Sequence, residues 1–191
     1  MALSVGITGG ICAGKSTVLN QLKELDQYVF DADDAVHELY RPGTPVTTLL
    51  RERYGDEVTD AEGGVNRRLL ADRVFNASAE LQWLNDLVHP FVKKAIEQRM
   101  MALDRPLYCA VPLLFEAGWD SDVDCTVAVW CDRLTQVERL QSRGWGIAEL
   151  KRRQAFQISM DEKMARADYG LINNSSPGIV KKQVQLLVDR I

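Results

Sequence analysis

One stretch near the start of the chain decides the fold: Gly9-Gly10-Ile11-Cys12-Ala13-Gly14-Lys15-Ser16-Thr17. It matches the pattern G-x-x-x-x-G-K-[ST], in which backbone N–H groups turn inward around a phosphate. Glycine suits that turn because it carries no Cβ. Lys15 supplies a point charge for the outer phosphates, and the Ser16 hydroxyl is a hard oxygen ligand for Mg²⁺. We therefore expect Gly10 to Thr17 to bind a nucleoside triphosphate together with Mg²⁺.

The flanks of this stretch support the same interpretation. Residues 3–8 are typical of a short buried strand, and residues 16–22 of the first turns of a helix. The N-terminus of that helix would direct its partial positive charge at the phosphates. The alternative is a glycine-rich turn with a surface lysine, but the four fixed positions match by chance in roughly one chain of this length in a hundred. The dinucleotide pattern G-x-G-x-x-G is absent, which disfavours a nicotinamide cofactor.

The composition is that of a globular protein with one main core. The chain has 191 residues, of which 46% are hydrophobic and 26% charged. Its net charge of −4 argues against a broad nucleic-acid binder. The longest apolar run, residues 109–115, is too short to span a bilayer, and the first residues lack the basic start of a signal peptide. Four cysteines without a C-x-x-C pair indicate free thiols, so we expect a cytoplasmic protein. From the net charge and the short apolar run, we expect that it binds neither nucleic acid nor a membrane.

Five short apolar segments predict a parallel sheet. They occupy residues 3–8, 28–30, 107–115 (a strand and its exit), 125–130 and 169–172. Most of their apolar residues run without alternation, and helical segments separate them, which is typical of a parallel sheet covered on both faces. The predicted fold class is therefore α/β, with a five-stranded parallel sheet.

Two stretches between the strands are helical and contain no predicted strand. One covers residues 34–104, where His89-Pro90 is expected to interrupt a helix that begins near Ser78. The other covers residues 141–166, where residues 147–163 are expected to form one basic helix. Ligands of open α/β sheets bind at the carboxyl ends of the strands, where both stretches leave and return. We expect a core of residues 1–33, 105–140 and 167–191, with both helical excursions able to close over a substrate.

Two carboxylates, Asp31 and Asp33, directly follow the second predicted strand. They are expected in an extended turn on the same rim as the phosphate-binding stretch, where both could face the ligand crevice. One would serve the metal ion, and the other would accept a proton from a substrate hydroxyl. The alternative is that they only cap a helix, which is a common use of aspartate.

The second helical excursion is rich in basic residues. Arg139 and Arg143 are one helical turn apart and are followed by Arg152, Arg153, Lys163 and Arg166. These side chains predict a lid that brings guanidinium groups to the phosphates, although a solvated helix face is the usual meaning of such charges. The residues alone favour a helix-capping or packing role for His89. Because His37 is the only other histidine of the sequence, no zinc site is predicted.

Motifs along nearly the whole chain resemble the dephospho-coenzyme A kinase family. They are Thr8-Gly9-Gly10-Ile11 with Gly14-Lys15-Ser16; Asp31-Ala32-Asp33; Arg67-Arg68; Arg73-Val74-Phe75; Trp83-Leu84-Asn85; Leu87-Val88-His89-Pro90; Val111-Pro112-Leu113-Leu114-Phe115-Glu116; Arg139, Arg143 and Gln157; Ala167-Asp168; and Ile172-Asn173-Asn174. The resemblance implies a P-loop NTPase core, a helical coenzyme A-binding insertion over residues 34–104 and a helical lid over residues 141–166. It also implies that ATP, with Mg²⁺, phosphorylates the ribose 3′-hydroxyl of dephospho-coenzyme A.

The same resemblance implies roles for individual residues. Asp33 would be the catalytic base, and Lys15 and Ser16 would contact the phosphates and the metal. Asp31 would contact the metal ion, and Arg143 would contact the phosphates from the lid. Three further residues would lie near the coenzyme or hold its site: Arg68, His89 and Glu116.

Three other functions remain as alternatives to this one. Another small-molecule kinase, for a nucleoside, nucleotide or shikimate-like alcohol, would share the phosphate-binding stretch and the aspartate pair. A GTP-dependent switch should carry N-K-x-D, which this sequence lacks. An ATP-binding module without transfer activity would not need the aspartate pair.

The chain departs from the family pattern at two positions. Position 12, usually glycine, is Cys12. Because a positive φ would cost cysteine about a kcal/mol or more, we expect a negative φ there. We also hypothesise that its thiol lies near an amide-lined, cation-rich pocket, which would lower its pKa and expose it to oxidation. At the second position Gly144 follows Arg143, where an acidic residue is frequent, which predicts a looser lid hinge.

Overall fold

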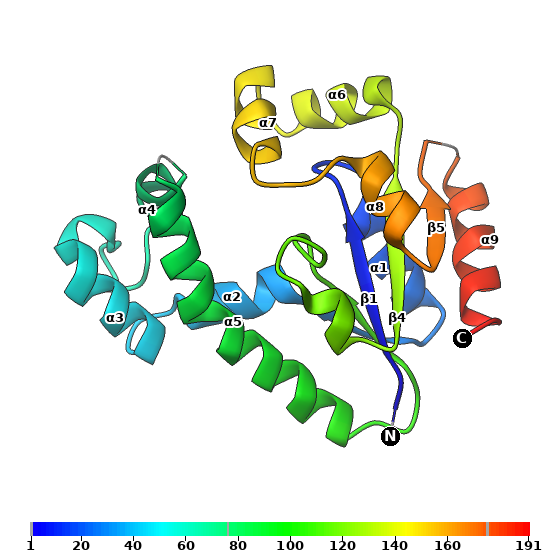
Figure 1. Cartoon of the computed structure of the whole chain (residues 1–191), viewed down its shortest axis with the longest axis horizontal. Helices are drawn as coiled ribbons and strands as arrows, with labels where there is room; N and C mark the ends of the chain where they lie inside the picture. Colours follow the sequence, from blue (N-terminus) through cyan, green and yellow to red (C-terminus); the bar gives the residue numbers. More distant parts are fainter. Residues whose placement is uncertain (1, 76, 175) are drawn as a thin grey trace. The chain divides into compact units, whose positions relative to one another are not determined.

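The computed structural model describes residues 2–75, 77–174 and 176–191. The chain divides into two compact units, each described here by itself. The first, the sheet unit, contains the residues up to Asp31 together with Arg99–Ile191. The second, the helical unit, is Ala32–Gln98. Figure 1 shows both units and labels most of their helices and strands.

The sheet unit is built on five parallel strands in the order β2-β3-β1-β4-β5. The strands are β1 (Ser4–Gly9), β2 (Tyr28–Asp31), β3 (Leu107–Ala110), β4 (Cys125–Trp130) and β5 (Tyr169–Ile172). This confirms the predicted five-stranded parallel sheet and the α/β class. All residues of the central strand β1 are buried, so the turn that follows it starts from a fixed point.

Helices α1 (Lys15–Glu24) and α9 (Pro177–Val188) contribute to the main core of the sheet unit. Their side chains pack with those of β1 and β4. The branched aliphatic residues of this core that are at most 1% exposed are Val5, Ile7, Val18, Leu22, Val127, Val129, Val180 and Val184. Burying a large aliphatic side chain contributes about 1.5–3 kcal/mol, so this layer anchors both α1 and the strand before it.

Helix α6 (Arg133–Ser142) follows β4, and the predicted lid, residues 141–166, contains α7 (Ile147–Gln154) and α8 (Met160–Arg166). The prediction of one helix over residues 147–163 is therefore wrong, because residues 155–159 are not helical. The reason is local: Ser159 caps α8, and its hydroxyl accepts a hydrogen bond from the Glu162 N–H at 3.0 Å. A side-chain cap of this kind satisfies a first-turn donor and fixes where a helix begins.

The helical unit consists of α2 (Ala32–Leu39), α3 (Pro45–Tyr54), the short 3₁₀ segment η1 (Gly55–Val58), α4 (Arg67–Val74) and most of α5 (Ser78–Met101). Helix α5 runs for 24 residues with Pro90 inside it, so the predicted interruption at His89-Pro90 is wrong. Its buried residues Leu84, Val88 and Val92 lie on both sides of Pro90. This continuous apolar side outweighs the one backbone hydrogen bond that proline removes.

Side-chain contacts join α3 to α5. The guanidinium of Arg53 lies 4.2 Å from the centroid of the Trp83 ring and donates two hydrogen bonds, each 2.9 Å, to Glu80. The Arg53 hydrogen bond is the main reason that the pKa of Glu80 falls to about 2. The helical unit thus has its own fixed packing around a charged and aromatic cluster.

Candidate functional site

The phosphate-binding stretch forms the turn between β1 and α1, as the sequence predicts. Lys15 is the first residue of α1, and Ser16 and Thr17 follow in its first turn. The Thr17 N–H donates to Gly14 O at 3.0 Å. Gly14 has a φ of 96°, and a Cβ there would lie 1.9 Å from Nδ2 of Asn173. Both its backbone conformation and its surroundings therefore require glycine.

Cys12 has a φ of 59°, so the expected negative φ is wrong. Cys12 is 6% exposed and packs with Leu140 of α6 and Leu150 of α7. The thiol therefore lies in an apolar cluster rather than in the expected amide-lined pocket. The left-handed conformation costs a residue with a Cβ about 1–2 kcal/mol, which burial of the side chain offsets.

Side chains distant in sequence hold the carbonyl groups of this turn. Ile11 O accepts from Nε2 of Gln136 at 2.8 Å. Nη1 of Arg139 donates to Cys12 O at 3.3 Å and to Ala13 O at 3.1 Å. Ala13 O also accepts from Nδ2 of Asn173 at 2.9 Å. In a trans peptide the N–H is directed opposite to the C=O, so the N–H groups of Cys12 and Gly14 point to the other side of the turn.

The ammonium group of Lys15 lies over the same turn. Its Nζ donates to Gly9 O at 2.8 Å, and Gly10 O is 3.5 Å away. Lys15 therefore places a positive charge next to the inward N–H groups and the N-terminus of α1. Peptide dipoles, oriented amides and an ammonium group together favour a bound anion.

The two predicted carboxylates fall on either side of the boundary between the units. Asp31 is the last residue of β2 and is half-buried. Asp33 is exposed in the first turn of α2, which begins at Ala32, so the expected extended turn is wrong. Acidic residues in a first turn are favoured by the helix dipole, which explains why Asp33 and Asp34 start a helix.

Glu116 lies in a buried ion pair with Lys163. Oε1 of Glu116 is 2.8 Å from Nζ of Lys163 and accepts a 3.0 Å hydrogen bond from the Ile158 N–H. The Lys163 ammonium also donates to Pro112 O at 2.7 Å and to the Thr8 hydroxyl at 3.2 Å. Burial lowers the pKa of Lys163, and the Glu116 carboxylate partly opposes this. Glu116 thus joins the segment after β3 to α8.

This pair corrects the prediction that Lys163 belongs to an exposed basic lid face, because Lys163 is fully buried. The sequence holds one signal for it. Lys163 lies three residues after Met160 and next to Met164, on the apolar side of a short helix.

The other lid arginines have separate partners. Arg143 follows α6, is exposed, and its guanidinium lies 6.0 Å from the centroid of the Trp145 ring. Glu149 pairs with both Arg152 and Arg153. Arg166 pairs with Asp120 at 3.3 Å. Of the two arginines that the sequence places one turn apart, Arg139 is directed at the phosphate-binding turn and Arg143 at Trp145.

The helical unit contains Arg68 and His89. Arg68 is exposed on α4, and His89 is half-buried on α5. Burial lowers the pKa of His89 and the charge of Lys93 lowers it further, while Asp86 raises it. The neutral form of the imidazole is therefore favoured.

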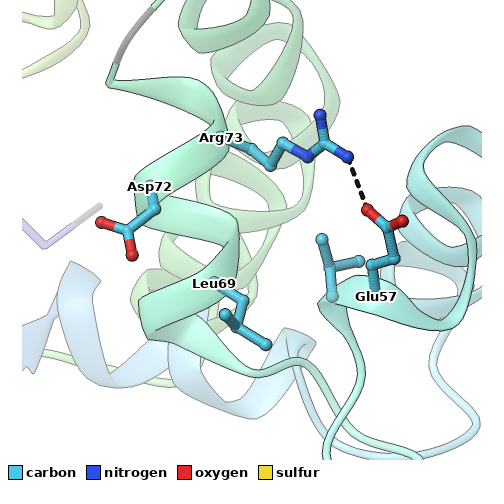
Figure 2. A pocket seen from close by; sticks show the side chains of 5 residues that line it. Glu57, Leu69, Asp72 and Arg73 are labelled. Atoms are coloured by element: carbon cyan, nitrogen blue, oxygen red, sulfur yellow. Dashed lines mark hydrogen bonds and ion pairs between the residues drawn. The ribbon is translucent and has the colours of Figure 1, made fainter.

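A shallow hollow of the helical unit contains none of the predicted site residues. Figure 2 shows its lining, which includes Leu69, Asp72 and the ion pair between Arg73 and Glu57. Within residues 2–75, 77–174 and 176–191, no three His, Cys, Asp or Glu side chains gather as a metal site. In the same part of the chain, no helix has the length and apolar character that crossing a membrane requires.

Comparison with known proteins identifies the family. The family model described as dephospho-CoA kinase matches residues 3–178. The chain belongs to the dephospho-CoA kinase family. Among curated relatives, the dephospho-CoA kinase of Symbiobacterium thermophilum is 38% identical over 186 residues, covering 95% of this chain and 78% of the relative. That of Anaeromyxobacter dehalogenans is 37% identical, covering 97% and 90%.

Solved structures share the fold of this chain. The crystal structure of TT1252 from Thermus thermophilus has a TM-score of 0.78 and 27% identity, with 100% of this chain and 98% of that one covered. Shikimate kinase from Aquifex aeolicus has a TM-score of 0.56 at 16% identity, with 98% and 96% covered. The latter likeness shows the shared fold alone. The dephospho-CoA kinase family thus uses the same α/β core as another small-molecule kinase.

Proposed function

We propose that this chain transfers the γ-phosphate of ATP to the 3′-hydroxyl of the ribose of dephospho-CoA, giving CoA and ADP. The observation that carries the proposal is the match of the dephospho-CoA kinase family over residues 3–178, which spans the helical unit and most of the sheet unit. The phosphate-binding turn supports the nucleotide part, and the family supports the acceptor. Because its cysteines are free thiols, we also propose a cytoplasmic location.

In this proposal the turn from Gly10 to Thr17 binds the phosphates of ATP. Backbone N–H groups and the N-terminus of α1 supply the donors, and the Lys15 ammonium moves from Gly9 O to the outer phosphates. Arg143 reaches the transferred phosphate from the lid, residues 141–166, and its exposure and its place at the end of α6 support this role. A guanidinium suits a transition state whose charge is spread over several oxygens.

The residues present fit a magnesium ion. Mg²⁺ in kinases is held by one or two oxygen side chains together with substrate phosphates, so a dedicated cluster of ligands is not required. Ser16 and Asp31 would supply those oxygens, since both belong to the sheet unit, with Ser16 in the first turn of α1 and Asp31 at the carboxyl end of β2. When bound, Mg²⁺ neutralises phosphate charge and orients the β- and γ-phosphates.

Asp33 is the proposed base that accepts the proton of the 3′-hydroxyl. Its exposure and its position two residues after β2 support the assignment. For the helical insertion, residues 34–104, we propose coenzyme binding that involves Arg68 and His89. Glu116 would support the coenzyme site indirectly, since its carboxylate is used by Lys163 and by the Ile158 N–H.

Phosphate transfer with a panel of acceptors tests this function. ADP formation is measured with dephospho-CoA, nucleosides, nucleotides and shikimate, and the phosphorylated position is read by phosphorus NMR. The expected result is turnover with dephospho-CoA and a new 3′-phosphate. Faster turnover with shikimate or a nucleoside would instead support the alternative of another small-molecule kinase.

A further inference from the structure

We infer that Arg139 is a positioning residue for the phosphate-binding turn, acting with Asn173 as a brace behind it rather than as a phosphate ligand. The inference rests on the proposed function only in that the turn binds phosphate. The name "brace" refers below to Arg139 and Asn173 together.

Both ends of the Arg139 guanidinium are used within the protein. Nη1 donates to Cys12 O at 3.3 Å and to Ala13 O at 3.1 Å. Nη2 donates to the backbone oxygen of Asn173 at 2.7 Å and to its Oδ1 at 3.2 Å. These bonds tie α6 to the turn after β1 and to the end of β5. Hydrogen bonds from a charged donor contribute about 1.5–3 kcal/mol each, more than those between neutral groups.

Asn173 fixes the other side of the brace and is 2% exposed. Its Nδ2 donates to Ala13 O at 2.9 Å, and its own backbone N–H donates to Trp130 O at 2.7 Å. Every polar group of Asn173 therefore has a partner. The contact is also close, because Gly14 lies against Nδ2 of Asn173 with no room for a Cβ.

The brace acts on a conformation that the turn would not favour alone. Cys12 is held at a φ of 59°, where a side chain with a Cβ is disfavoured. Arg139 and Asn173 bind the carbonyls of Cys12 and Ala13, so these peptide planes cannot rotate without losing hydrogen bonds. The N–H of Gly14 is thereby fixed toward the phosphate side before a ligand binds. Preorganised donors bind and stabilise charge better than donors that must first reorient.

Arg143 shows the contrast with a ligand-type arginine. It is exposed, whereas Arg139 is half-buried and its guanidinium nitrogens are occupied. The sequence places both in the same basic stretch, and the structure separates them.

Two measurements on variants test the brace. Amide hydrogen exchange is followed in the ligand-free protein at Ala13, Thr17 and Val18, whose N–H groups donate to Gly10 O and Gly14 O. The affinities for ATP and for inorganic triphosphate are measured by calorimetry. The variants are Arg139→Met, Arg139→Lys and Asn173→Ala, with Lys181→Met as a control, since Lys181 pairs with Glu24 at the surface.

We expect Arg139→Met to speed exchange in the turn about tenfold or more and to weaken ATP and triphosphate binding by the same factor, about 10- to 100-fold, as the loss of charged hydrogen bonds predicts. Arg139→Lys should restore part of both effects, because an ammonium can reach one carbonyl but cannot also bridge to Asn173. Combining Arg139→Met with Asn173→Ala should cost less than the sum of the two single changes, since both act on Ala13 O. The control should change neither quantity.

Unchanged exchange together with weaker ATP binding would overturn the inference, since a direct ligand leaves the free turn unaffected. A loss for ATP that is much larger than for triphosphate would also overturn it, because it would indicate contact with the nucleoside. If Arg139→Met does not fold, Arg139→Lys and Asn173→Ala decide the question by the same readings. Neither the exchange rate nor the binding affinity requires turnover. If dephospho-CoA is not the phosphate acceptor, the transfer assay shows this separately and the test of the brace is unaffected.

Discussion

The buried ammonium of Lys163 lies 2.8 Å from the carboxylate of Glu116, and the same ammonium is 3.2 Å from the hydroxyl of Thr8 in β1. The pair therefore connects α8, the segment after β3, and the strand that leads into the phosphate-binding turn. Met160 of the same helix lies against Gly10, where a Cβ would be 2.4 Å from Cγ of Met160. Helix α8 thus supports the start of the turn from one side.

The ion pair predicts an asymmetric response to mutation. Lys163→Met leaves the Glu116 carboxylate without its cation at a site only 14% exposed, and should lower the free energy of unfolding by about 3–5 kcal/mol. Adding Glu116→Gln removes the unpaired charge and should recover part of that loss. Urea unfolding measures both, and Arg166→Met, in an exposed pair, should cost at most about 1 kcal/mol. A double variant no more stable than Lys163→Met would contradict this account.

Asp33→Asn should abolish turnover while leaving ATP binding almost unchanged. Asparagine is nearly isosteric with aspartate but cannot accept the hydroxyl proton, and general base catalysis contributes about 10²- to 10⁴-fold. The rate of ADP formation and the calorimetric affinity for ATP separate the two effects. Turnover at the wild-type rate would exclude Asp33 as the base.

Cys12 should react slowly with alkylating reagents in the folded protein. The side chain is 6% exposed and packs with Leu140 and Leu150, so the reagent cannot reach the sulfur without opening of the cluster. The rate of iodoacetamide labelling at Cys12, read by mass spectrometry and compared with the denatured chain, measures this. Labelling as fast as that of a free thiol would show that the cluster opens readily, and only labelling faster than that of a free thiol would restore the hypothesis of a reactive loop cysteine.

A second change at the same position separates strain from packing. Cys12→Ala keeps the left-handed conformation but loses the sulfur, and should cost about 1 kcal/mol. Cys12→Gly loses the same contact but relieves the strain, so its unfolding free energy should lie nearer to that of the wild type. A glycine variant clearly less stable than the alanine variant would mean that φ at this position carries little cost.

His89 should make stability depend on pH on the acid side. Burial lowers its pKa in the folded state below the unfolded value near 6.5, so the unfolded chain binds more protons between those two pKa values. Stability should therefore fall as the pH drops below about 6.5, and the fall should be shallower in His89→Gln. Chemical unfolding of both proteins between pH 5 and pH 8 gives the difference. Parallel curves would show that the protonation of His89 is not linked to folding.

Predictions from sequence succeeded where the deciding interactions are local. The turn after β1 needs only its glycines and the start of a helix, and the strand segments need only continuous apolar residues. They failed at Pro90 and at residues 155–159. At Pro90 the continuous buried side of α5 outweighs one missing N–H, and at residues 155–159 the cap at Ser159 starts a new helix.

The sequence by itself determined the parallel α/β core, the phosphate-binding turn and the family. Only the tertiary structure decided which basic residues of one stretch serve which purpose. Arg139 braces the turn, Lys163 is buried against Glu116, and Arg143 stays exposed. The reason is that the charge of a side chain follows from its residue type, whereas its burial and its hydrogen-bond partners depend on groups that folding brings close. Asn173 lies far from Ala13 in the sequence, and Glu116 lies far from Lys163.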